Sequence, residues 1–141
     1  MGLTELGWRM AINSYRDLTI WRKGMDLATE IYRLAKIMPK TEEYRLTSQI
    51  LRSAASVPAN IAEGHFRGSR KEYAQYVRIA RGSLAETETF LILAMRTHLI
   101  SEAEAEVALR LADELGRQLN VLWQRLDTSR RPPPPNPRPK P

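Results

Sequence analysis

Residues 17–38 read DLTIWRKGMDLATEIYRLAKIM, and the spacing of their apolar side chains indicates one long amphipathic helix. At about 100° per residue, every polar side chain from Thr19 to Lys36 falls within an arc of roughly 140°. The apolar remainder covers about half the circumference, more than a helix needs to face one neighbour. We therefore expect contacts on two sides. Because a single bundle would leave part of this face uncovered, we also expect an oligomer interface that includes Trp21, Met25 and Tyr32.

Three further helices are expected at short intervals, over residues about 42–63, about 69–97 and about 101–127. Capping boxes open the last two of them, formed by Ser69 with Glu72 and by Ser101 with Glu104. Short connections make successive helices antiparallel. The sequence therefore predicts an all-α fold, an antiparallel up-down-up-down four-helix bundle.

The domain boundaries follow from proline and charge. Residues 17–127 should form the bundle, residues 1–16 an N-terminal extension, and residues 128–141 a basic, proline-rich, disordered tail. The net charge is +6, and four of the bases lie in this tail. The R-x-x-P-x-x-P spacing there is compatible with a proline-rich ligand, a polyanion contact or a plain disordered end. The rest of the chain is nearly balanced, so the high pI alone does not indicate nucleic-acid binding.

Several classes of function lack their characteristic residues. The sequence contains no cysteine, which excludes disulfides, thiolate metal sites and a cysteine nucleophile. It also contains no P-loop, no G-x-S-x-G motif and no cluster spaced like metal ligands. Because no apolar run is long enough to span a bilayer and the N-terminus lacks the pattern of a signal peptide, we expect a cytoplasmic protein with no membrane partner. We expect no enzymatic activity, no cofactor and no bound metal.

Basic side chains gather on one side of the helix expected over 69–97. Four of them fall within about 100° of arc on the helical wheel, and such a stripe can neutralise nucleic-acid phosphates. The candidate nucleic-acid-binding residues are Arg67, Arg70, Lys71, Arg78 and Arg81. A solvated outer face of the bundle gives the same pattern, and the pattern alone favours that interpretation. Trp21 and Trp123 are expected to be core or interface anchors rather than platforms for base stacking.

The helix expected over 42–63 contains an unusual proline. Pro58 removes the hydrogen bond to the carbonyl of Ala54 and should kink the helix or split it, and Gly64 should then end it.

Polar side chains flank this proline within a small and apolar helix. Arg52, Asn60 and Glu63 would need partners if they are buried, and Arg52 could pair with Glu63 or with a neighbouring helix. A polar network that fixes helix packing is the favoured interpretation, and a ligand notch at the kink is the alternative.

Four stretches of the chain carry a family resemblance. YRDLTIWRKGM at 15–25, LTSQ at 46–49, SVPANIAEG at 56–64 and IARGSLAE at 79–86 closely resemble four-helix bundle proteins encoded in intervening sequences of bacterial 23S ribosomal RNA genes. The resemblance covers about residues 15–126. It implies an antiparallel bundle that assembles into a ring-like homopentamer. The chain departs from the usual pattern at Arg45, commonly glycine in the family, and at Leu51, commonly arginine.

The resemblance also suggests partners. The family is similar in fold to the accessory variability proteins of diversity-generating retroelements, which bind a reverse transcriptase and nucleic acid. We therefore expect a non-enzymatic homo-oligomer, a pentamer by resemblance, that binds nucleic acid, with RNA as the leading candidate. The alternative is a protein-interaction platform, such as an accessory subunit of a reverse transcriptase. A structural oligomer with no further partner is the plainest possibility.

Overall fold

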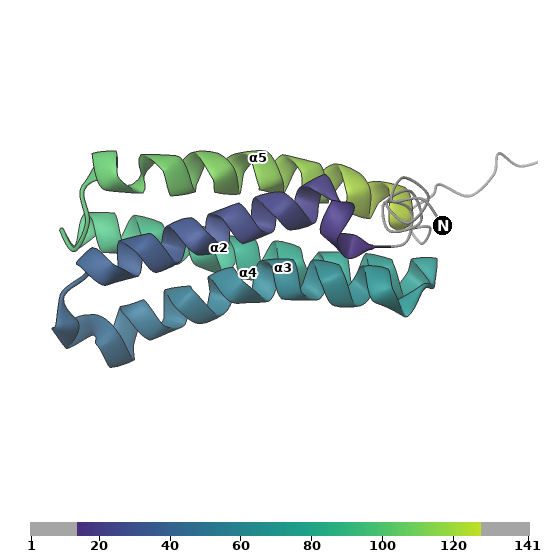
Figure 1. Ribbon diagram of the computed structural model, residues 1–141. Coiled ribbons are helices and arrows are strands. Elements are labelled where there is room, and N and C mark those ends of the chain that lie inside the picture. Colours follow the sequence, from purple (N-terminus) through teal and green to yellow (C-terminus); the bar gives the residue numbers. More distant parts are fainter. Residues whose placement is uncertain (1–13, 128–141) are drawn as a thin grey trace, which may run out of the picture.

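The computed structural model describes residues 14–127, and these residues form four α-helices in an antiparallel bundle (Figure 1). The predicted four-helix bundle is thereby confirmed. The helices are α2 (Thr19–Ile37), α3 (Ser48–Arg67), α4 (Arg70–Arg96) and α5 (Glu102–Leu126). A 3-10 turn, η1 (Tyr15–Asp17), precedes α2. The predictions for the tail at 128–141 and for nearly all of the N-terminal extension lie outside the described residues.

Each helix packs mainly against two neighbours. α2 and α4 both contact α3 and α5, so α2 and α4 lie diagonally across the bundle. The centre is filled by fully buried aliphatic side chains from all four helices, which include Leu27, Ile31, Ile61, Val77, Leu91, Leu115 and Leu119. Each such side chain contributes about 1.5–3 kcal/mol relative to exposure in water. Burial from all four helices therefore accounts for the bundle.

Ser69 and Ser101 both cap helix starts, and Ser101 with Glu104 forms the complete capping box. Ser101 Oγ accepts a hydrogen bond from the Glu104 amide at 3.1 Å, and the Glu104 carboxylate accepts one from the Ser101 amide at 2.9 Å. This second bond lowers the pKa of the Glu104 carboxyl. At α4, Ser69 Oγ accepts from the Glu72 amide at 3.1 Å, but its hydroxyl, rather than its amide, contacts the Glu72 carboxylate. Local sequence therefore sets where α4 and α5 begin.

The predicted bounds of the second helix, 42–63, are wrong at both ends. A 3-10 turn, η2 (Lys40–Glu42), and a π turn, η3 (Glu43–Thr47), precede α3, and the backbone leaves helical dihedrals at Arg45. α3 ends at Arg67, where Gly68 adopts the left-handed conformation with φ of 81° that favours glycine. Gly64, predicted as the stop, lies buried inside the helix.

Both Gly64 and Pro58 instead bring helices close together. A Cβ placed on Gly64 would lie 2.6 Å from Cβ of Tyr76, so only glycine lets α3 approach α4 this closely. Pro58 does not split α3, which continues across it as one helix. A Cβ placed on Gly24 of α2 would lie 3.3 Å from Cβ of Pro58. The proline ring therefore forms part of the contact between α2 and α3.

Candidate nucleic-acid interface

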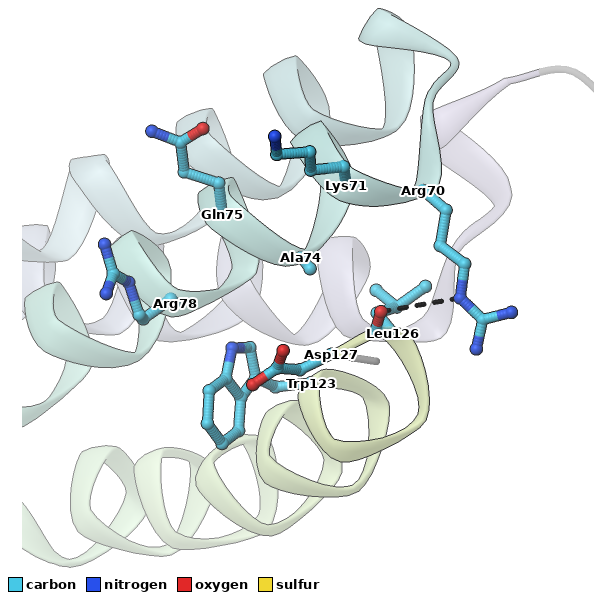
Figure 2. A pocket seen from close by; sticks show the side chains of 8 residues that line it. All are labelled: Arg70, Lys71, Ala74, Gln75, Arg78, Trp123, Leu126 and Asp127. Carbon is cyan, nitrogen blue, oxygen red and sulfur yellow. Dashed lines mark hydrogen bonds between the residues drawn. The ribbon is translucent and has the colours of Figure 1, made fainter. Parts of the chain in front are cut away.

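A pocket of about 560 Å³ opens between the start of α4 and the end of α5 (Figure 2). Its lining residues are Arg70, Lys71, Ala74, Gln75, Arg78, Trp123, Leu126 and Asp127. The antiparallel run of α4 and α5 brings these residues together, because the first turns of α4 lie beside the last turn of α5. α4 supplies the cations, α5 supplies an aromatic ring and an aliphatic side chain, and Asp127, which follows α5, supplies one carboxylate.

Arg70 joins the two helices at one end of this pocket. Its Nε donates to the carbonyl of Leu126 at 3.4 Å, and its Nη2 donates to the carbonyl of Arg125. These carbonyls belong to the last turn of α5, where backbone oxygens lack helical partners and the helix dipole favours a cation. Arg70 therefore caps α5, a structural role beside its predicted part in nucleic-acid binding.

Trp123 stands beside the basic side chains of α4. Part of this side chain packs against the core, as expected of an anchor, and part lines the pocket. The guanidinium carbon of Arg81 lies 4.8 Å from the Trp123 ring centroid, within the range of a cation–π interaction. The structure thus brings Arg70, Lys71, Arg78 and Arg81 to one region around this ring.

Arg67 lies apart from this group. Its guanidinium pairs with Glu63 at 2.9 Å and Glu72 at 3.5 Å, and it lies over the ring of Tyr76. The hydrogen bond from Arg67 holds the pKa of the Glu63 carboxyl below its usual value, and a bond from the Tyr76 hydroxyl acts in the same direction. The positive charge of Arg67 is therefore paired with carboxylates of the bundle itself.

The segment at 52–64 takes part in a polar network between α3 and α4. Asn60 Nδ2 donates to the carbonyl of Ser56 at 2.7 Å and to its hydroxyl at 2.8 Å. The Ser56 hydroxyl in turn lies 2.8 Å from the Ser83 hydroxyl. Thr87 Oγ1 donates to Ser53 Oγ at 2.9 Å. The geometry supports the packing interpretation of this segment.

The partners in this network differ from those expected. Hydroxyl groups bridge the two helices, whereas Arg52 is exposed and Glu63 pairs with Arg67 rather than with Arg52. Serine and threonine suit a close helix contact, because short side chains can bond across it without separating the backbones. Of the two alternatives given for Arg52, the pairing with Glu63 is therefore not formed.

A second depression, of about 520 Å³, is an apolar groove between α2 and α3. It is lined by Tyr15, Trp21, Met25, Ala28, Thr29, Tyr32, Ala55, Pro58, Ala59 and Ala62. Met25 and Tyr32 are 42% and 53% exposed despite their size. The three residues predicted for an oligomer interface therefore share one groove, while the oligomer itself stays a prediction.

Within residues 14–127, His, Asp and Glu side chains do not gather in threes as metal ligands would. No helix within residues 14–127 is both long enough and apolar enough to cross a membrane.

Sequence reasoning missed the α5 half of the pocket: Trp123 as a lining residue, Leu126 and Asp127. The register of the hairpin was the available signal. In two antiparallel helices joined by a short loop, residues equally distant from the loop lie opposite each other. The loop at 97–101 therefore places the end of α5 against the start of α4.

Fold and pocket together define an all-α four-helix bundle with a cationic pocket at one end. The chain belongs to the 23S rRNA-intervening sequence protein family, whose model matches residues 16–121. The family resemblance carried by the four motifs is thereby confirmed. No curated protein matches the chain.

A similar solved structure supports the fold. It is a crystal structure of a protein of unknown function from the S23 ribosomal protein family of Bacteroides thetaiotaomicron. It aligns with a TM-score of 0.70 at 29% sequence identity, over 75% of this chain and 99% of that one.

Proposed function

We propose that this protein is a non-enzymatic helical scaffold that associates with itself and binds nucleic acid, with RNA as the leading partner. The observation that carries the proposal is the pocket between α4 and α5, where Arg70, Lys71 and Arg78 share one concave lining. Such clusters bind nucleic-acid backbones because their positive charges neutralise the phosphates and release the counterions held there.

The charge at this pocket is a local feature. Outside the tail, the chain has 18 Lys and Arg residues and 16 Asp and Glu residues, so its excess of positive charge is small. Other bases of the bundle are paired with acids, such as Arg33 with Glu30 and Arg117 with Asp113. The ion pairs of residues 14–127 do not include Lys71 or Arg78, which are both exposed. Their charge is available to an anionic partner.

Self-association supports the same function. The apolar groove between α2 and α3 leaves Met25 and Tyr32 exposed, and a second copy of the chain would cover them. A pentamer, the form that the family resemblance implies, would display five copies of the cationic pocket. Several modest patches on one assembly gain affinity for a single long strand through avidity.

The test is a charge-reversal variant, Lys71→Glu/Arg78→Glu/Arg81→Glu, which leaves the α5 cap by Arg70 intact. A matched control, Lys36→Glu/Arg52→Glu/Arg110→Glu, changes the net charge equally at exposed positions outside the pocket. Binding to a structured RNA is measured by fluorescence anisotropy over a salt series.

We expect the pocket variant to lose roughly 100-fold in affinity at low salt, with a shallower salt dependence, because phosphate contacts are removed. The control should keep most of the affinity. Undetectable binding by the wild-type protein at low salt, or equal losses in both variants, would contradict the proposal.

The apolar groove also favours a second candidate, a platform for a protein such as a reverse transcriptase. In that case the groove receives the partner rather than another copy of this chain. The mass of the isolated protein in solution separates the two functions: an assembly supports the scaffold, and a lone protomer with an open groove supports the platform.

A further inference from the structure

Positive charge alone does not explain how the α4–α5 pocket is built. A flat row of lysines and arginines on a helix is sufficient to neutralise phosphates. Here Lys71 and Arg78 flank a concavity whose wall also includes Ala74, Trp123 and Leu126. Figure 2 shows the indole of Trp123 between the two helices. An aromatic and aliphatic wall among cations suits a ligand with both a flat apolar part and an anionic part.

Arg81 adds to the aromatic character of this wall. Its guanidinium lies over the ring of Trp123, a residue that also lines the pocket. An arginine over an aromatic ring holds the ring in place and contributes to nucleobase stacking sites.

The division of the lining between the two helices indicates how a ligand would be oriented. Lys71 and Arg78 come from α4, whereas Trp123 and Leu126 come from α5. Anionic phosphates would lie nearer Lys71 and Arg78, and a flat base would lie nearer the indole.

We propose that this pocket binds an unpaired nucleotide of a single-stranded nucleic acid, with its base against Trp123 and its neighbouring phosphates on Lys71 and Arg78. The inference rests on the proposed function and names its ligand more closely. In a duplex the base faces are covered by stacking, so a ring in a pocket can meet them only in loops, ends or single strands. Single-stranded RNA and single-stranded DNA share this chemistry.

The experiment compares three fluorescein-labelled probes of equal length: single-stranded RNA, single-stranded DNA and the matched DNA duplex. Each is titrated with the full chain and with Trp123→Leu and Trp123→Phe at several salt concentrations. We expect Trp123→Leu to weaken single-strand binding by about tenfold, because base stacking on the indole is lost. Trp123→Phe should retain much of the affinity. The salt dependence and the duplex affinity should stay the same, since the phosphate contacts are unchanged.

A spectroscopic measurement keeps the test valid if Trp123→Leu misfolds. In a Trp8→Phe/Trp21→Phe variant, Trp123 is the remaining tryptophan. Saturating single strands should quench its fluorescence, whereas the duplex should not. Tighter binding of the RNA or of the DNA strand assigns the source of the nucleotide and supports the inference in either case.

Two results would overturn the inference and can be told apart. Equal binding of single strands and duplex, without quenching and without an effect of Trp123→Leu, removes the base site but leaves the phosphate interface standing. Undetectable binding of all three probes at low salt removes the inference and the proposed function together.

Discussion

The bundle carries two contrasting regions on opposite sides. The pocket between α4 and α5 has long cationic side chains around an indole, whereas the groove between α2 and α3 has large apolar side chains over alanine and proline. Charge-based contacts weaken as salt rises, while burial of apolar surface does not depend on charge screening. The contrast predicts that the two proposed activities, nucleic-acid binding at the pocket and self-association at the groove, can be disrupted separately.

The largest expected effect comes from placing charge in the apolar groove. Met25→Glu/Tyr32→Glu should abolish self-association, because an unpaired carboxylate in a buried interface is strongly unfavourable. Sedimentation velocity at micromolar concentration measures the assembly. A matched variant, Ile92→Glu/Val121→Glu, alters apolar residues of similar exposure outside the groove and should assemble as the wild type does. If the wild-type protein sediments as a single protomer, the groove does not mediate self-association, and this distinction between the two regions is wrong.

A smaller effect is expected from Gly64, which lies at the contact between α3 and α4, outside both the pocket and the groove. Gly64→Ala should destabilise the fold by about 1–3 kcal/mol, because the added Cβ would lie 2.6 Å from Cβ of Tyr76. Gly82→Ala is its matched control, since no atom lies within 4 Å of a Cβ there. That variant should gain about 0.5–1 kcal/mol in helix stability. Urea denaturation measures both, and equal stabilities of the two variants would contradict the close contact.

The smallest effect concerns the charges between α4 and α5. Burial and the nearby charge of Asp113 raise the pKa of the half-buried Glu88 carboxyl. The folded state thus binds a proton more readily than the unfolded chain, so stability decreases as the pH rises from the ordinary pKa through the raised one. Glu88→Gln should be slightly more stable than the wild type at pH 7, with the difference fading in acid. A difference that is constant from pH 7 to pH 4 would rule out this cause.

Local signals predicted much of the fold. The serine caps at Ser69 and Ser101 are recognisable because each cap and its partner lie three residues apart. The role of Gly64 was not recognisable, because its reason is Tyr76 on the next helix rather than any neighbour in sequence. A glycine near the expected end of a helix resembles a stop until that contact is known.

The candidate site was predicted on one side only. The periodicity of α4 placed Lys71 and Arg78 together, but periodicity within one helix says nothing of what a second helix adds. The part of Trp123 in the pocket wall depends on how α5 returns against α4. Arg67 is separated from the group because it pairs with Glu63, four residues earlier in α3, and with Glu72 at the start of α4. The pair within α3 was not predicted, because the helix was expected to end at Gly64.

The wall that α3 contributes to the apolar groove consists of Ala55, Pro58, Ala59 and Ala62. Alanine and proline have essentially no rotamer freedom to lose when they are covered. A molecule that settles on this wall therefore immobilises side chains mainly on α2, such as Met25 and Tyr32. Half of the groove is rigid before any encounter, which lowers the entropic cost of association and favours a partner of complementary shape.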